Sequence, residues 1–149
     1  MDSTVPIRLV LGGGSLLNQV ARELGTALER QLAPLEVTSQ QAALLLNAAR
    51  QQASPNQLAA KLGTDAAGMT RLLDRLADKG LLVRRGNPDD RRSVVIELTG
   101  KGKALVPRLG PCFGRVTSRL LDGFTAEEIE QVTALLGRML DNLGTGKAG

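Results

Sequence analysis

The sequence predicts a mainly α-helical protein that carries one small β-hairpin. Leucine, valine and alanine recur at helical spacing along most of the 149-residue chain. Polar capping sequences, Thr38–Gln41, Ser54–Gln57 and Thr125–Glu128, mark points where helices begin. Residues 81–98 differ, because two short apolar runs flank a Gly-Asn-Pro-Asp-Asp turn, with Asn87 and Pro88 fitting the first two positions of a type I turn.

The first expected helix covers residues 15–33 and ends at Pro34. Its apolar stripe consists of Leu17, Val20, Leu24, Leu28 and Leu32. The helix that begins after Thr38 has Ala42, Leu45, Leu46 and Ala49 on one face. A short third helix begins at Ser54-Pro55, with proline at its first position, and stops at Gly63.

The fourth helix is capped by Asp65 and closed by Gly80. Its apolar stripe is Met69, Leu72, Leu73 and Leu76, which we interpret as core. The opposite face carries Ala66, Gly68, Thr70, Arg71 and Arg75. Strands are then expected at residues 81–85 and 93–98.

After Thr99 the chain is expected to be helical again, with Leu105, Leu109, Val116, Leu120 and Leu121 as apolar positions. Pro107, Gly110, Pro111 and Gly114 interrupt this stretch and predict a kinked helix. The last helix carries Ile129, Val132, Leu135, Leu136, Met139 and Leu140.

The composition argues against several classes of protein. There is one cysteine and no histidine, which excludes zinc fingers, histidine-based catalysis and a disulfide within one chain. We find no nucleophile–base pair, carboxylate dyad, phosphate loop or metal cluster, and therefore expect no enzyme activity, cofactor or metal. No apolar run approaches the roughly 20 residues that span a bilayer, and no secretion signal is visible, so we expect a cytoplasmic protein.

The positive charge is concentrated in one part of the chain. Residues 54–103 contain ten Lys or Arg and six Asp or Glu, a net charge of +4, and the rest of the chain is neutral. Four of these arginines, Arg84, Arg85, Arg91 and Arg92, flank the hairpin turn. The charge is either an ordinary solvated surface or a footprint for nucleic-acid phosphates.

The order of these elements favours DNA. Two short helices joined by a tight corner form a helix-turn-helix, whose second helix can enter a major groove. A basic hairpin directly after it is a wing, whose tip can place an arginine in the neighbouring minor groove. Asp90, two residues before Arg92, is expected to orient that guanidinium. The expected DNA-binding residues are Asp65, Ala66, Gly68, Thr70, Arg71, Arg75, Arg84, Asp90, Arg91 and Arg92.

The sequence TRLLDRLADKGLLVRRGNPDDRRSVVIELTGKG resembles the MarR family of bacterial winged-helix transcription regulators. The resemblance runs from about residue 8 to residue 143. Its most specific part is the D-x-R-S wing with the L-T-x-x-G that follows: Asp90, Arg92, Ser93, Leu98, Thr99 and Gly102. It implies an obligate dimer that binds a near-palindromic operator, and control by a ligand or a thiol in many members.

The expected organisation is a single domain over residues 1–149. Residues 37–99 form the winged helix-turn-helix lobe, and residues 8–36 and 100–143 form a helical dimerisation lobe. The apolar stripes of the first and last helices are too large for one small lobe to bury. We therefore expect Leu17, Val20, Leu24, Val132, Leu135, Leu136 and Met139 to pair two copies across a two-fold axis.

The function expected from these observations is a dimeric repressor released from double-stranded DNA by a small-molecule effector, with no membrane association. The alternative is a winged helix used only for protein–protein contacts. The chain departs from the family in two places. Ala66, Ala67 and Gly68 offer no hydrogen-bonding side chains, which leaves base readout to Thr70, Arg71 and Asp65. The prolines interrupt a helix that is usually regular, and Cys112 in that region is expected to be a buried, inert thiol.

Overall fold

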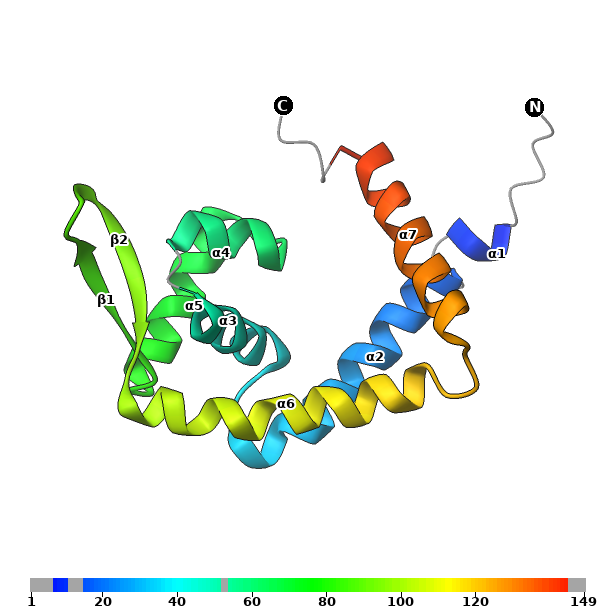
Figure 1. Ribbon diagram of the computed structural model, residues 1–149, viewed down its shortest axis with the longest axis horizontal. Coiled ribbons are helices and arrows are strands. Elements are labelled where there is room, and N and C mark those ends of the chain that lie inside the picture. The colour runs from blue at the N-terminus through cyan, green and yellow to red at the C-terminus, as the bar shows by residue number, and fades with distance from the viewer. Residues whose placement is uncertain (1–6, 11–14, 52–53, 145–149) are drawn as a thin grey trace. The chain divides into compact units, whose positions relative to one another are not determined.

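A computed structural model of the chain describes residues 7–10, 15–51 and 54–144. The predicted fold class is confirmed: the protein is mainly helical, with one antiparallel hairpin (Figure 1). The elements are α1 (Ile7–Val10), α2 (Leu16–Leu32), the 3-10 helix η2 (Ala33–Leu35), α3 (Ser39–Arg50), α4 (Pro55–Leu62), α5 (Ala66–Asp78), β1 (Leu82–Asn87), β2 (Asp90–Leu98), α6 (Gly100–Leu120) and α7 (Ala126–Asn142). Helix α1 was not predicted.

The chain divides into two compact units, residues 1–116 and 117–149. The first unit contains the hairpin, helices α1 to α5 and most of α6. The second contains the end of α6 and all of α7. Each unit is therefore described by itself.

Capping side chains fix where the helices begin. All three predicted capping boxes are present: the hydroxyls of Thr38, Ser54 and Thr125 each accept a hydrogen bond from the backbone three residues later, and the Gln or Glu there accepts one in return. Helix α5 ends at Asp78, and Gly80 shortly after it has a φ of 72°, which lets the backbone N–H groups of Gly80 and Leu81 reach the carbonyls of Ala77 and Leu76.

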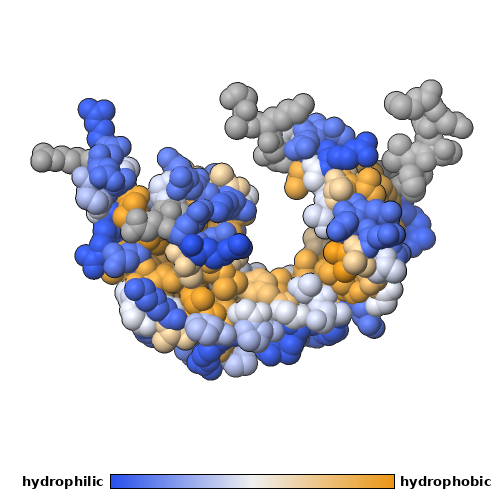
Figure 2. Space-filling model, in the orientation of Figure 1, coloured by the Kyte–Doolittle hydropathy of each residue, from blue (hydrophilic) through white to orange (hydrophobic). Residues whose placement is uncertain are grey.

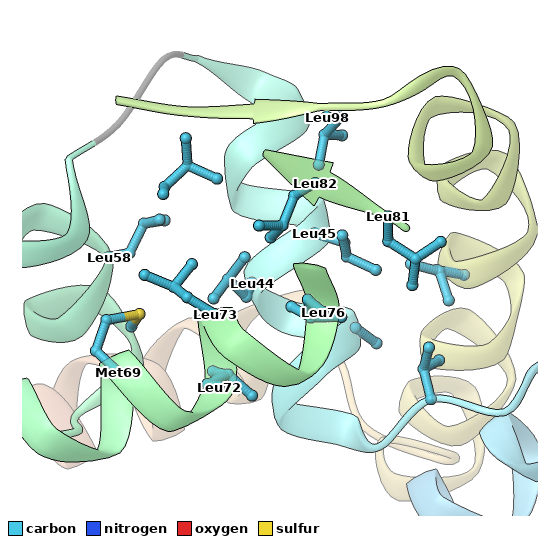
Figure 3. Packing of buried hydrophobic residues seen from close by; sticks show 14 of the residues in the cluster. Leu44, Leu45, Leu58, Met69, Leu72, Leu73, Leu76, Leu81, Leu82 and Leu98 are labelled. Atoms are coloured by element: carbon cyan, nitrogen blue, oxygen red, sulfur yellow. The ribbon is translucent and has the colours of Figure 1, made fainter. Parts of the chain in front are cut away.

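The core of the first unit is built from leucine (Figure 3). Side chains from α3, α4, α5 and the hairpin point toward one another, with Leu44, Leu58, Leu76 and Leu82 almost wholly buried. The predicted stripe of α5 is part of it, since Met69, Leu72, Leu73 and Leu76 are all buried. The close packing holds the outer face of α5 and the hairpin in fixed positions on one lobe.

Leu32, at the end of the α2 stripe, belongs to this core and is 0% exposed, so the lobe itself buries this part of the stripe. Helix α6 is continuous over 21 residues with Pro107 and Pro111 inside it, and the kink expected there stays a prediction. Both prolines are on the exposed side, where water can satisfy the carbonyls that lack an N–H partner, while Leu109 and Cys112 are buried on the other side.

The L-T-x-x-G sequence joins the hairpin to α6. The Thr99 hydroxyl donates to the Gly80 carbonyl (2.6 Å) and accepts from the Gly102 N–H (3.1 Å). A Cβ on Gly102 would lie 2.0 Å from the Leu81 carbonyl oxygen, so only glycine fits. The motif therefore locks the start of α6 against the corner between α5 and β1.

Candidate nucleic-acid interface

Helix α5 turns a small, cationic face to solvent. Ala66, Thr70, Arg71 and Arg75 are all exposed, opposite the buried leucines. The Thr70 hydroxyl donates to the Ala66 carbonyl (3.0 Å), which leaves its oxygen free only to accept and its methyl free to make apolar contacts. The start of this face can approach another surface closely, because Ala66, Ala67 and Gly68 in the first turn have small side chains or none.

The first turn of α5 owes its composition to packing. The Asp65 carboxylate accepts a hydrogen bond from the Gly68 N–H at 2.7 Å, which satisfies a free donor of the helix end. A Cβ on Gly68 would lie 2.3 Å from the Thr64 hydroxyl oxygen. Gly68 and Asp65, both expected at the interface, therefore have roles in the helix start, and the Asp65 carboxylate is already engaged.

The hairpin carries a bulge next to its tip. Asn87 pairs with Asp90 across the two-residue turn Pro88-Asp89, and Gly86 pairs with Val94. Gly86 and Asn87 are adjacent, but residues 91–93 intervene between their partners. The pairing thus leaves Arg91, Arg92 and Ser93 as extra residues on β2. Both strands also extend further toward the turn than the predicted residues 81–85 and 93–98.

Asp90 braces this bulge through the backbone. Its carboxylate accepts a hydrogen bond from the Arg92 N–H (3.0 Å), and its carbonyl accepts one from the Ser93 hydroxyl (3.3 Å). The expectation that Asp90 orients the Arg92 guanidinium is not supported, because the contact in the structure is to the backbone. The D-x-R-S sequence therefore shapes the tip, and it leaves the Arg92 side chain exposed. The side chain of Arg91 lies outside the described part of the structure.

The arginines at the base of the hairpin are paired within the lobe. Arg84 faces the same side as buried Leu82 and forms an ion pair and hydrogen bond with Asp74 of α5. Arg85, on the other face, bonds the Glu97 carboxylate at 2.6 Å, across the hairpin. Asp74 was missed from the sequence, since only the docked hairpin brings it to a residue ten positions later.

The surfaces of the hairpin tip and of α7 differ in hydropathy (Figure 2). Hydrophilic residues cover the projecting end of the hairpin, whereas the visible surface of α7 has hydrophobic residues between hydrophilic ones. In the first unit, Leu17 and Val20 of α2 are 39% and 50% exposed, and Leu24 is half-buried. In the second, the predicted dimerisation residues are all at least 37% exposed: Val132, Leu135, Leu136 and Met139.

The described ranges contain neither a metal-binding cluster nor a membrane-spanning helix. There, no three potential ligands among His, Cys, Asp and Glu come together in a way that would hold a metal ion. No helix in the same ranges has the length and apolar character to cross a bilayer. Cys112 is buried as expected, with its sulfur 3.6 Å from the guanidinium of Arg115, a neighbour that sequence reasoning did not identify.

The chain is similar to members of a known family, including two that were solved with DNA. The model of the MarR family matches residues 35–93. The chain is similar to a cysteine-to-serine mutant of MarR from E. coli in complex with operator DNA, with 30% identity, coverage of 91% of this chain and 98% of that chain, and a TM-score of 0.77. It is also similar to S. aureus MepR in a DNA complex (26% identity, 85% and 95% coverage, TM-score 0.79).

A third similar structure contains a ligand. It is CouR from Rhodococcus jostii RHA1, bound to p-coumaroyl-CoA. The identity is 25%, the coverage is 83% of this chain and 88% of that chain, and the TM-score is 0.78.

Proposed function

The chain belongs to the MarR family of DNA-binding transcription regulators, and we propose that it acts in the cytoplasm as a homodimer on a pseudo-palindromic operator. The observation that carries the proposal is the exposed small, cationic face of α5, held on the same lobe as a bulged tip with two arginines. The relatives solved with DNA support it.

Helix α5 is the element we assign to the major groove, which admits an α-helix. Arg71 and Arg75 would contact phosphates or guanine edges. Thr70 would accept from a base amino group or touch a thymine methyl group, because its own proton is used by the Ala66 carbonyl. With Ala66 and Gly68 at the helix start, much of the sequence preference would come from methyl contacts and DNA shape.

The wing tip, residues 88–93, is the element we assign to the minor groove. Arg91 and Arg92 lie in the bulge, outside the regular pairing of the two strands. A narrow minor groove concentrates negative potential and favours an inserted arginine. We assign a different role to Arg84, which holds the wing against α5 through its ion pair with Asp74. Arg85 is paired with Glu97 on the neighbouring strand.

Dimerisation would bury the exposed apolar residues of α2 and α7. Two copies across a two-fold axis would set the two α5 helices about one DNA turn apart, roughly 34 Å, over half-sites centred about 10 base pairs apart. We also propose that the protein represses transcription and that an effector releases it. The ligand-bound relative supports that part.

A footprint on the DNA beside the protein's own gene, followed by binding measurements at several salt concentrations, tests the proposal. We expect protection of two half-sites and an affinity that falls steeply with salt, since each phosphate neutralised contributes about −0.9 to the slope of log K against log salt. The alternative function, a winged helix for protein contacts alone, predicts no protection and no preference over scrambled DNA.

A further inference from the structure

The linker between α2 and α3 turns the chain over residues 33–38. Helix α2 ends at Leu32, η2 follows, and Thr38 caps α3. Between them, Glu36 has a φ of 59° and a ψ of 33°, a left-handed conformation that costs energy in a residue other than glycine. A linker in this conformation needs contacts that hold it in place.

Lys79, at the end of α5, supplies such contacts. Its ammonium group donates to the Glu36 carbonyl and to the side-chain oxygen of Gln41, the second at 3.1 Å. The same oxygen of Gln41 accepts from the Thr38 N–H, also at 3.1 Å, in the capping box of α3. One lysine therefore joins the end of α5 to the linker and to the first turn of α3.

The backbone around Lys79 is itself held to α6. The Lys79 carbonyl accepts a hydrogen bond from the Lys101 ammonium at 2.9 Å. The next carbonyl, that of Gly80, accepts one from the Thr99 hydroxyl at 2.6 Å. The Lys79 side chain thus extends from a fixed backbone, so the groups that it binds are held relative to α5.

Leu32 and Lys79 act differently on α2. Leu32 is fully buried and anchors the end of α2 in the core, but apolar packing has little directional preference, whereas hydrogen bonds need a defined geometry. The Glu29 carboxylate, which accepts from the Ser39 N–H at 2.8 Å, ties α2 to α3. Lys79 adds the tie to α5, and it therefore contributes to the angle between α5 and α2.

That angle matters because α2 is long. Its 17 residues give a length of about 25 Å at the usual rise per residue. A rotation of about 10° at the linker would move the far end of the helix, near the exposed Leu17 and Val20, by about 4 Å. This displacement exceeds the distance between successive base pairs, which is roughly 3.4 Å.

We propose that Lys79 is a positioning residue, which sets the angle between α5 and α2 and thereby the half-site spacing that the dimer accepts. The step to DNA rests on the proposed function, in which Leu17 and Val20 pair two copies and α5 enters the major groove. Lys79 acts through the linker, and not through a contact with DNA.

Operator duplexes that differ only in the distance between their half-sites test this role. They carry the half-sites that the footprint identifies, with one or two base pairs inserted or removed at the centre. We expect the wild type to lose at least about tenfold in affinity for one inserted base pair. Lys79→Met removes the ammonium group from an exposed side chain of similar length, and we expect it to lose less than about threefold. Circular dichroism should show that this variant is folded.

A phosphate contact of Lys79 would give a different result. It would weaken binding to every duplex alike and lower the slope of log K against log salt by about 0.9. Lys103→Met is the control, because it removes the same charge from an exposed position on α6 and should keep the spacing preference of the wild type. A uniform loss in Lys79→Met overturns the proposal, as does an equally relaxed preference in Lys103→Met.

Gln41→Glu is the conservative variant on the other side of the contact. A glutamate keeps an oxygen that can accept from Thr38 and Lys79, and its charge strengthens the second hydrogen bond. We expect a spacing preference at least as sharp as that of the wild type, which is lost again when Lys79→Met is added. A relaxed preference in Gln41→Glu alone contradicts the positioning role.

A measurement without DNA separates this inference from the proposed function. A spin label attached at Ala67→Cys, in a Cys112→Ser background, reports the distance between the α5 helices of two copies. We expect one narrow distance distribution when Lys79 is present and a broader one in Lys79→Met. Equally narrow distributions would show that Lys79 does not position α5. The expected broadening in a protein that protects no operator would support the positioning of α5 and contradict the proposed function.

Discussion

Helices α5 and α7 carry the same pattern of apolar residues, but only α5 buries it within the chain. Met69 and Leu76 are 1% and 0% exposed, whereas Leu135 and Leu136 are 48% and 41% exposed. The spacing shows which face of a helix is apolar, and it does not show what covers that face. Helix α5 is covered by neighbours in its own lobe. For α7, the cover we propose is a second copy of the chain.

A charge placed in the exposed apolar stripe of α7 is the strongest test of this difference between the two helices. We expect Leu136→Asp to weaken operator binding by about 100- to 10,000-fold, because a monomer loses the linkage between two half-sites. Light scattering should show a monomer, and circular dichroism should show a folded DNA-binding lobe, since Leu136 belongs to the other unit. Ala134→Asp introduces the same charge on the opposite face of α7 and should leave binding intact. A wild-type monomer that still protects a single half-site tightly would refute the dimer.

Truncating one leucine in each helix sharpens the comparison. Leu76→Ala should lower the free energy of unfolding by about 2–5 kcal/mol at any protein concentration, because it leaves a cavity in the lobe's own core. Leu135→Ala should have an effect that changes with protein concentration, because the contacts it removes are between copies. Urea denaturation at several concentrations separates the two. A concentration-independent loss for both variants would show that α7 is covered from within the chain.

Two of the glycines of α6, Gly102 and Gly110, extend the same contrast to the backbone. Gly102 has the Leu81 carbonyl 2.0 Å from where a Cβ would lie, and Gly110 has nothing within 4 Å. We expect Gly102→Ala to cost about 1–3 kcal/mol through overpacking. Gly110→Ala should stabilise the protein by about 0.5–1 kcal/mol through helix propensity. Thermal melting of both variants measures this, and equal melting temperatures would contradict the close contact between Gly102 and the Leu81 carbonyl.

Much of the fold was readable from the sequence where the signal is local. The three capping boxes and the closing Gly80 appear as expected, because each depends on residues within a few positions. What the sequence did not show depends on distant residues. Leu32 is buried by side chains from other helices, and α6 continues through Pro107 because packing of its opposite face outweighs the lost hydrogen bonds.

The candidate site was partly readable for the same reason. The sequence indicated which residues are basic and which strand carries them, but not which of them are already paired. Arg84 reaches Asp74 only because the docked hairpin faces α5. The role of Asp90 depends on a bulge whose length follows from strand pairing.

The wing tests whether Arg92, which is exposed at the tip, differs from Arg84, which is paired with Asp74. We expect Arg92→Ala to weaken operator binding by about 1–3 kcal/mol without changing stability, as for one groove contact. Arg91→Ala should be measured beside it, because either residue of the bulge can be the one in the groove. Arg84→Ala should lower stability as well as affinity, since it removes the contact with Asp74. Unchanged gel-shift affinity in both bulge variants would exclude the tip from DNA contact.

The substitution Cys112→Ser is expected to change operator affinity least. The Cys112 side chain is buried, and serine can replace its contacts. The thiol is 3% exposed, and its sulfur lies 3.5 Å from the carbonyls of Gln31 and Arg108. A serine hydroxyl can donate to the same carbonyls, so we expect Cys112→Ser to keep operator affinity within about twofold. The neighbouring Arg115 guanidinium, which donates to the Gln31 side chain at 2.7 Å, is a cation that favours the thiolate, but burial keeps oxidants from the sulfur. Gel shifts before and after mild peroxide should therefore be the same for wild type and variant. Release of the wild type alone would show that Cys112 is a redox sensor.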